Sequence, residues 1–290
     1  MQRDVCLIVN PSAGGGRAAA RLPAVEAALR RHGVSFREER TSSMEHAREL
    51  AAGARDAGET VVAMGGDGLT GALAGVLHGS EALLGVVPGG RGNDFARKLG
   101  IPEDPEAAVA VIAGGSCRTV DVALCDGRAY LGILSAGFDS DVQVIANDTS
   151  LKLGDGVYVY GALRALARWQ PARWTVTVDG ARREFTGYSV AVANTGVFGG
   201  GMRLVPDAQV DDGLLDVVLT AHSSRAHLLR GLRKVFRGTH VTDPALTFLQ
   251  GREVVFEADR PFTAFADGDP IAELPVRIGI APRSLKVLAP

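Results

Sequence analysis

The first 120 residues alternate between two hydrophobic periods, and this alternation limits the fold more than any other feature of the chain. Short β-branched runs are each followed, after a brief connection, by a stretch with helical periodicity. The expected strands are Val5–Val9, Val34–Glu38, Thr60–Ala63 and Leu83–Val87, and the expected helices cover 17–31, 44–57 and 70–78. This order predicts an open α/β domain with a parallel sheet and helices on both faces.

From about residue 120 the pattern changes to short alternating runs separated by turn residues such as Asp179-Gly180. The expected strands are Trp174–Val178, Tyr188–Ala193 and Arg252–Phe256, and helices are expected near 157–169 and 223–237. Such runs are typical of antiparallel strands. We therefore expect an α/β domain over 1–125 and a β-rich domain over 126–290, which pack closely and form a cleft.

Composition excludes several classes of protein. Lys and Arg total 31 and Asp and Glu total 33, so the net charge of -2 argues against a nucleic-acid binder. The cysteines, Cys6, Cys117 and Cys125, lack the spacing of a zinc site and are typical of reduced thiols in a cytoplasm. The chain shows no signal-peptide pattern and no run of about 20 apolar residues. We expect a soluble, cytoplasmic protein.

Three glycine-rich loops follow expected strands, at Asn10–Arg17, Met64–Thr70 and Pro88–Arg97. Glycines allow a sharp turn that presents backbone N–H groups to an anion, and a following helix adds its positive end. The carboxylates of Asp67 and Asp94 could hold Mg²⁺ directly or through water. One such loop is common, but three at the same edge of a sheet predict a site for a phosphorylated ligand.

Two familiar phosphate-binding motifs are absent from these loops. No G-x-G-x-x-G motif stands in the context of a dinucleotide-binding fold, and no Gly-Lys-Ser/Thr occurs anywhere. Lys98 is the only lysine before residue 150. A phosphate here would therefore be held by backbone amides, hydroxyls, arginines and metal.

The loops carry a resemblance to a known family. Asn-Pro-x-x-Gly, Gly-Gly-Asp-Gly and Pro-x-Gly-x-x-Asn-Asp-Phe-Ala-Arg, in this order, resemble the diacylglycerol kinase catalytic family, above all its bacterial lipid kinase branch, which is similar to sphingosine kinases. The likeness continues through Ser135–Asp139, Gly199–Met202, Pro206–Ala208, Asp211–Asp216 and Ala266–Pro270. The resemblance implies ATP-dependent phosphorylation of a lipid hydroxyl, in a cleft between an α/β domain and a β-sandwich.

The resemblance also implies roles for individual residues. The nucleotide contacts would come from Asn10, Pro11, Ser12, Ala13, Gly14, Thr41, Gly65, Gly66, Asp67, Gly68, Leu69, Thr70, Gly71, Arg91, Asn93 and Asp94. A structural Mg²⁺ would be bound by Gln209, Asp212 and Leu214. The general base would be Asp269, with Asp267 beside it.

The residues around Asp269 admit two interpretations. On an extended chain Asp267 and Asp269 would lie on the same side, and close carboxylates raise one another's pKa, which suits a base that takes the hydroxyl proton. Without the family pattern, Asp267-Gly268-Asp269 is more typical of an acidic turn between two strands, since Asp-Gly favours turns.

The chain departs from the family pattern at several positions. Leu69 stands where the family has threonine, Thr70 falls one place late, and Gly71 and Ala72 replace a polar pair. Arg91 also replaces a threonine, and we expect it to supply the lost phosphate contact with added charge. Asp269 is one methylene shorter than the family's glutamate. These changes bear on rate and nucleotide preference more than on fold.

The expected helix over 223–237 is basic and amphipathic. Its cations are Arg225, Arg230, Arg233, Lys234 and Arg237, and its apolar residues are Leu228, Leu229, Leu232, Val235 and Phe236. It could lie on the anionic inner membrane face, or pack on the β-rich domain with a solvated cationic face. Trp169 and Trp174 offer a second membrane-facing patch or core packing. Exposed edge strands are compatible with a homodimer.

Three functions remain open on the sequence. The leading one is a lipid kinase, whose acceptor could be diacylglycerol, a sphingoid base or another lipid alcohol. The second is a soluble-substrate phosphotransferase of the NAD-kinase type, which shares the Gly-Gly-Asp-Gly loop. The third is a nucleotide- or lipid-binding module with little catalysis, which the changes at Leu69, Gly71, Ala72 and Asp269 favour.

Overall fold

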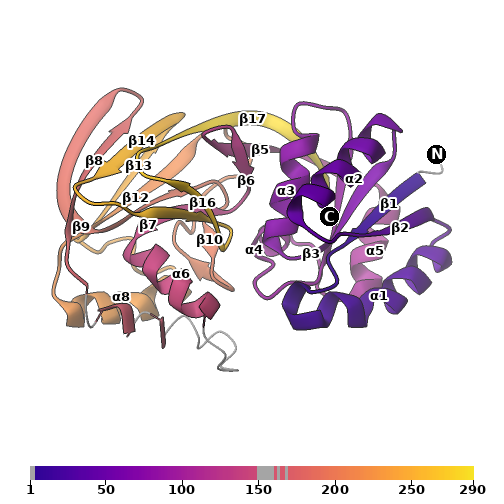
Figure 1. The fold of residues 1–290 in the computed structure, drawn as a ribbon, viewed down its shortest axis with the longest axis horizontal. Coiled ribbons are helices and arrows are strands. Elements are labelled where there is room, and N and C mark those ends of the chain that lie inside the picture. The colour runs from indigo at the N-terminus through magenta and orange to yellow at the C-terminus, as the bar shows by residue number, and fades with distance from the viewer. Residues whose placement is uncertain (1–3, 149–159, 162–163, 167–168) are drawn as a thin grey trace. The chain divides into compact units, whose positions relative to one another are not determined.

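A computed structural model describes residues 4–148, 160–161, 164–166 and 169–290 (Figure 1). It divides into two compact units. Unit 1 comprises Met1–Val122, Ala129–Leu131 and Ala281–Pro290, and unit 2 comprises Ala123–Arg128 and Gly132–Ile280. The chain therefore leaves unit 1 near residue 122 and comes back to it through its last ten residues.

Unit 1 contains the parallel α/β sheet that the sequence predicted. Its strands lie in the order β2-β1-β3-β4, and the end of β17 pairs with β4, all in parallel. The bounds are β1 (Asp4–Val9), β2 (Ser35–Arg40), β3 (Thr60–Gly65), β4 (Leu83–Pro88) and β17 (Val276–Leu288). The charged residues at the end of β2 belong to the strand because β2 lies at the edge, where charge is tolerated.

Five helices complete unit 1: α1 (Ala13–Arg31), α2 (Met44–Asp56), α3 (Asp67–Leu77), α4 (Asp94–Lys98) and α5 (Pro105–Gly114). The sequence analysis did not anticipate α4 or α5, although α5 carries clear boundary signals. Asp104 caps its first turn by accepting a hydrogen bond from the N–H of Ala107 at 3.0 Å, Pro105 opens it, and Gly115 ends it in the left-handed conformation.

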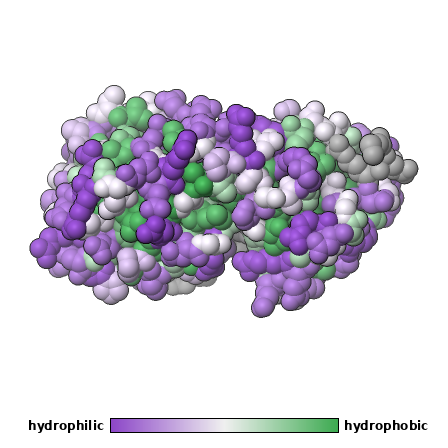
Figure 2. Space-filling view, turned by 90° about the horizontal axis from the view of Figure 1, so that it is seen from above, coloured by the Kyte–Doolittle hydropathy of each residue, from purple (hydrophilic) through white to green (hydrophobic). Residues whose placement is uncertain are grey.

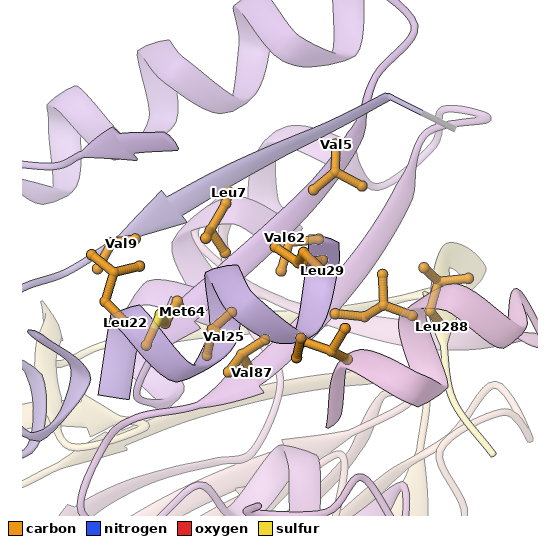
Figure 3. Close-up of a cluster of buried hydrophobic side chains, with 13 residues drawn as sticks. Val5, Leu7, Val9, Leu22, Val25, Leu29, Val62, Met64, Val87 and Leu288 are labelled. Carbon is orange, nitrogen blue, oxygen red and sulfur yellow. The ribbon is translucent and has the colours of Figure 1, made fainter. Parts of the chain in front are cut away.

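The core of unit 1 follows from the alternation of side chains along its strands. Every second residue of β1 points to one face, where the helices α1 and α5 pack on it. Figure 3 shows this cluster, whose labelled members are Val5, Leu7, Val9, Leu22, Val25, Leu29, Val62, Met64, Val87 and Leu288. Leu288, near the end of the chain, ties the end of β17 into the same core.

Unit 2 is an antiparallel, sandwich-like arrangement of strands, as expected. The order is β16-β15-β7-β9-β8-β14-β17, with β12 paired to both β9 and β13. Strands β5 (Cys117–Cys125) and β6 (Arg128–Tyr130) each have residues in both units. The bounds of the others are β7 (Ile133–Gly137), β8 (Ala172–Val178), β9 (Ala181–Ala193), β10 (Val197–Phe198), β11 (Met202–Arg203), β12 (Leu215–Ala221), β13 (Leu246–Gly251), β14 (Glu253–Ala258), β15 (Thr263–Ala266) and β16 (Asp269–Glu273).

The long strand β9 organises unit 2. Its residues up to Gly187 pair with β8, and its residues from Gly187 onward pair with β12 and β7. The predicted turn before it is confirmed: Asp179 and Gly180 have φ of 47° and 82°, so the two-residue turn that joins β8 and β9 has positive φ at both positions.

Two helices of unit 2, α6 (Phe138–Asp148) and α8 (Arg225–Arg237), lie within the described residues (Figure 1). Of the helix expected near 157–169, the described residues 160–161 and 164–166 are helical, residue 169 is not, and the others lie outside the described residues. Ser224 caps α8 by accepting a hydrogen bond from the N–H of His227 at 3.2 Å, and Gly238 ends it in the left-handed conformation.

The two tryptophans do not form a membrane-facing patch. Trp169 is 7% exposed and Trp174 is 1% exposed. Both pack among aromatic rings, Trp174 stacking on Phe262 with ring centroids 5.1 Å apart, and the Arg260 guanidinium lies 5.1 Å from the Trp169 ring. The alternative of core packing is therefore the correct one.

On the face shown in Figure 2, hydrophilic side chains predominate and hydrophobic ones occur in small patches. The large hydrophobic side chains exposed by more than a third among the described residues are Val144, Phe236 and Val241. None of the described helices is long and apolar enough to cross a membrane.

Candidate active site

The site in unit 1 lies where the order of the sheet reverses. From β1 the chain passes to β2 on one side, and then to β3 on the other side of β1. In open α/β sheets, ligands bind at such a switch point, beyond the carboxyl ends of the strands. The loops after β1 and β3 flank this point, and the loop after β4 lies next to them.

The three loops approach one another backbone to backbone. An ideal Cβ at Gly14 would lie 2.5 Å from the carbonyl oxygen of Gly89, and one at Gly90 would overlap the Cα of Gly66. Gly89 donates its N–H to the carbonyl of Gly65 at 2.8 Å. Only glycine leaves room for these approaches, so the three loops pack main chain against main chain.

The loop after β1 is folded by its own side chains. Asn10 Oδ1 accepts hydrogen bonds from the N–H of Ser12 at 3.1 Å and from its hydroxyl at 2.8 Å. Gly14, Gly15 and Gly16 have φ of 62°, 70° and 92°, so the chain turns through three left-handed residues before the regular part of α1. Pro11 and Ala13 complete this turn.

Thr41 follows β2 at the same edge of the sheet. It is 7% exposed and donates its N–H to the carbonyl of Val9 at 2.9 Å. Its hydroxyl donates to the carbonyl of Ser43. The predicted nucleotide contacts after β1, β2, β3 and β4 are therefore brought to one edge by the parallel sheet.

Asp67 connects the loop after β3 to the start of α4. Its two carboxylate oxygens accept the N–H groups of Asp94 and Phe95, each at 3.1 Å. Burial raises the pKa of Asp67, and these backbone hydrogen bonds act in the opposite direction because they stabilise the ionised form.

Asp94 completes a pair of carboxylates with Asp67. An ideal Cβ at Gly92 would lie 3.0 Å from Asp94 Oδ2 and 3.3 Å from Asp67 Oδ2, so both oxygens face the same point. Mg²⁺ is commonly held by one or two carboxylates together with phosphate and water oxygens, so Asp67 and Asp94 have suitable chemistry, although Asp94 Oδ1 is paired with the Arg97 guanidinium at 2.9 Å. Within the described ranges no group of three or more His, Cys, Asp or Glu is placed to hold a metal.

Several predicted contact residues support the loops from inside. Asn93, with φ of 52°, accepts the N–H of Gly90 at 2.8 Å on its Oδ1, and its Nδ2 donates to the carbonyl of Gly90 at 3.2 Å. Thr70 donates its hydroxyl to the carbonyl of Gly66 at 3.1 Å and is 2% exposed. Leu69 and Gly71 are buried, whereas Gly68 is half-buried and Arg91 is exposed.

In unit 2, Asp267 and Asp269 flank the turn between β15 and β16. Asp267 and Gly268 have φ of 53° and 94°, so the expectation of an extended chain here is wrong and the turn interpretation is correct. Asp267 Oδ1 accepts the N–H of Gly132 at 2.9 Å, which holds the turn against the start of β7. Asp269 is exposed at the surface, and the pKa of its carboxyl is raised by partial desolvation rather than by the neighbouring carboxylate.

The predicted residues of the structural metal site lie in the turn before β12. Asp212 Oδ1 accepts the N–H of Leu214 at 2.9 Å, and Gln209 donates its side-chain amide to the carbonyl of Asp207 at 3.2 Å. The side chains of Gln209 and Asp212 are exposed. The amide and carboxylate oxygens of this turn are hard ligands of the kind that Mg²⁺ prefers.

The sequence analysis did not anticipate a cavity beneath α8. About 810 Å³ of unfilled space, including the part open to solvent, lies between α8, α6 and the neighbouring strands and loops. Its apolar lining comes from Phe138, Phe198, Met202, Leu204, Leu228, Leu229, Val235 and Leu246. Asp139, in the first turn of α6, also lines it, and burial raises the pKa of this carboxyl to about 6. In the sequence, this part of unit 2 was singled out by the Ser135–Asp139 motif.

Comparisons with known proteins agree with this architecture. The model of the diacylglycerol kinase catalytic domain matches residues 4–125, and the model of the YegS C-terminal NAD kinase beta sandwich-like domain matches residues 132–289. The chain therefore belongs to the diacylglycerol kinase catalytic family, a family of lipid kinases.

Individual relatives extend over nearly all of the chain. A protein of Mycobacterium tuberculosis named "Diacylglycerol kinase" is 32% identical over 99% of this chain and 95% of its own length. A "Probable lipid kinase YegS-like" of Chromohalobacter salexigens is 30% identical over 82% of this chain and 79% of its own. The crystal structure of a diacylglycerol kinase from Bacillus anthracis str. Sterne has a TM-score of 0.77, at 21% identity over 99% of this chain and 97% of that one, and it shares the fold.

The close approach of the loops makes Gly90 sensitive to any side chain. We expect Gly90→Ala to lower the free energy of unfolding by about 1–3 kcal/mol, since its Cβ would overlap the backbone of Gly66. Gly53→Ala, in the last turn of α2 with nothing within 4 Å of the new methyl group, should raise the free energy of unfolding by about 0.5–1 kcal/mol. Urea unfolding measures both, and equal stability of the two variants would contradict this packing.

The raised pKa of Asp139 predicts a pH-dependent cost in stability. Its folded pKa of about 6 lies above the ordinary value of 3.8, so the folded state holds the proton more tightly than the unfolded state. Wild type should therefore lose stability, relative to Asp139→Asn, as the pH rises from about 4 to 7. We expect the difference to change by roughly 1–3 kcal/mol, measured by unfolding at each pH. A constant difference would show that Asp139 titrates normally.

Proposed function

We propose that this protein is an ATP- and Mg²⁺-dependent kinase that phosphorylates the hydroxyl group of a lipid, such as diacylglycerol, at a membrane surface. The observation that carries the proposal is the set of three glycine loops packed backbone to backbone at the switch point of the parallel sheet. Family membership supports it, since the M. tuberculosis relative is named a diacylglycerol kinase.

The loops of unit 1 would bind the nucleotide. Phosphoryl transfer depends mainly on positioning and on neutralising negative charge, because the phosphoryl group itself needs little covalent help. Main-chain N–H groups around Gly14 and Gly66 would face the phosphates, and Arg91 would add positive charge from its exposed position. Asp67 and Asp94 would hold Mg²⁺, which would neutralise phosphate charge when bound.

In unit 2, Asp269 would act as the general base. A base works best with a pKa near the operating pH, and partial desolvation moves the pKa of Asp269 in that direction. The proton of the lipid hydroxyl would pass to this carboxylate as the hydroxyl oxygen bonds to the terminal phosphorus of ATP, and the bond from that phosphorus to the bridging oxygen would break to release ADP. Asp267 would position the turn through its bond to the N–H of Gly132 rather than share the proton.

The helix α8 would make the membrane contact. Its cations Arg225, Arg230, Arg233, Lys234 and Arg237 are all exposed, and Phe236 is 36% exposed among them. Such a helix favours anionic headgroups, with each basic residue contributing about 1 kcal/mol near the surface.

Catalysis is tested by turnover with Asp269 variants. Mg-dependent ATP consumption should appear with mixed micelles of lipid alcohols, and Asp269→Asn should reduce kcat at least 100-fold, the usual range for loss of a general base. Glu273→Gln, an exposed acid at the other end of β16, is the matched control and should keep wild-type kcat. Turnover of NAD instead of lipid, or ATP binding without turnover on any acceptor, would refute the lipid kinase proposal.

Membrane binding is tested separately by charge removal. Changing Arg230, Arg233 and Lys234 together to Gln should weaken binding to vesicles of phosphatidylserine and phosphatidylcholine by about 100-fold, given roughly 1 kcal/mol for each charge. The same number of Arg→Gln changes at Arg37, Arg40 and Arg55 in unit 1 is the control. Vesicle sedimentation at low and high salt gives the measurement, and equal binding of both variants would contradict a role for α8.

A further inference from the structure

Arg17 joins two of the glycine loops of unit 1 through its side chain. It stands in the first regular turn of α1, directly after Gly16, and an ideal Cβ at Gly14 would lie 3.1 Å from its own Cβ. Its Nη1 donates a hydrogen bond to the carbonyl of Gly90 at 2.9 Å. The guanidinium is therefore held where the loop after β1 meets the loop after β4.

Arg17 forms no ion pair with a carboxylate among the described residues, in contrast to other arginines of unit 1. Arg37 pairs with Glu59 at 2.7 Å. Arg40 pairs with Glu38 at 2.6 Å. Arg17 instead bonds to a neutral carbonyl and is exposed, so its full positive charge acts on the space around the glycine loops, where an anion would be stabilised by it.

The bond to Gly90 orients Arg17 without using up its donors. A guanidinium carries five N–H groups, and Arg17 makes this one hydrogen bond with the described part of the chain. The carbonyl of Gly90 also accepts from Nδ2 of Asn93 at 3.2 Å, so it keeps a partner if Arg17 turns away from it. Arg17 can therefore offer two N–H groups to an oxyanion at a small cost in free energy.

Arg91, in the loop after β4, is the cation that the sequence predicted for a phosphate contact. It is exposed and makes no hydrogen bond or ion pair with the described residues. A side chain that is already held in place loses less conformational entropy on binding than a free one. Arg17 is therefore better prepared than Arg91 to bind an anion at these loops.

We propose that Arg17 binds the phosphate groups of the nucleotide and takes the part that a lysine plays in many phosphate-binding loops. Lys98 is the only lysine before residue 150, and it lies at the end of α4 rather than in a glycine loop. A planar guanidinium matches two phosphate oxygens at once, whereas an ammonium group acts as a point charge. The inference rests on the proposed nucleotide site of unit 1 and is independent of the acceptor.

The test measures ligand binding by isothermal titration, with Mg²⁺ present and lipid absent. Arg17→Gln should weaken the binding of ATP and of inorganic tripolyphosphate by about 10- to 100-fold, the range for loss of a hydrogen bond to a charged group, and should leave adenosine unaffected. Arg48→Gln, at an exposed position of α2 outside the three loops, removes the same charge and is the matched control. It should keep both affinities within about threefold of wild type.

Two further measurements separate a contact with phosphate from support of the loops. Arg17→Lys keeps the charge without the planar fork, so its affinity for tripolyphosphate should lie between those of wild type and Arg17→Gln. Raising the salt concentration from about 0.05 to 0.5 M should narrow the difference between wild type and Arg17→Gln at least threefold, since ions screen an exposed charge. Urea unfolding of the free variants controls for folding and should give midpoints close to that of wild type.

Three results would overturn the inference: equal affinity of wild type and Arg17→Gln for tripolyphosphate, an equal loss of adenosine binding, or a loss that salt leaves unchanged. A wild type that binds ATP but phosphorylates no lipid, with the loss in Arg17→Gln intact, would refute the proposed kinase activity and uphold the role of Arg17. A wild type that binds neither ATP nor tripolyphosphate would refute both.

Discussion

The backbone contact among the loops after β1, β3 and β4 is the constraint on which the rest of the unit 1 site depends. Gly14 meets Gly89, and Gly90 meets Gly66, at distances that exclude a Cβ atom. With the loops so close, the side chain of Asn93 can close the loop after β4 and that of Asp67 can reach the start of α4. The glycines act because they have no side chain, which lets the loops pack closely. This close packing sets the positions of the polar groups around them.

Three carboxyl groups of the molecule lie where the folded protein destabilises their ionised forms. Desolvation raises the pKa of Asp67, Asp139 and Asp269 alike, which means that the folded protein disfavours their charged forms. Asp67 is compensated by backbone N–H groups. Among the described residues, the hydroxyl of Ser189 stabilises the ionised form of Asp139.

The helix α8 is held mainly by its ends. None of its described side chains is fully buried, and its apolar residues Leu228, Leu229 and Val235 border the cavity. Ser224, Gly238 and the contact between His227 and Asp243 fix its two termini and its first turn. A segment with few buried apolar contacts can rearrange at a low cost in free energy, as the membrane contact proposed for α8 would require.

The amino-acid sequence is sufficient to predict the local elements and the glycine loops of unit 1. The βαβ alternation predicted the parallel sheet, and the Asp-Gly pairs predicted the hairpin turns, because hydrophobic period and positive φ are local properties. It predicted the edge at which Asn10, Thr41 and the glycine loops meet, since parallel strands end together. The sequence also contains the boundary signals of α5, Asp104, Pro105 and Gly115, although this helix was not among those expected.

Features that depend on contacts between residues far apart in the sequence appear first in the folded chain. Asp267 leaves the extended conformation because it is held to Gly132 across the sheet, and Trp169 and Trp174 enter the core because distant strands bring aromatic partners to them. The cavity with Asp139 needs α6, α8 and the loop at His240 together. Burial and pKa follow from such packing, and no local pattern of residues contains them.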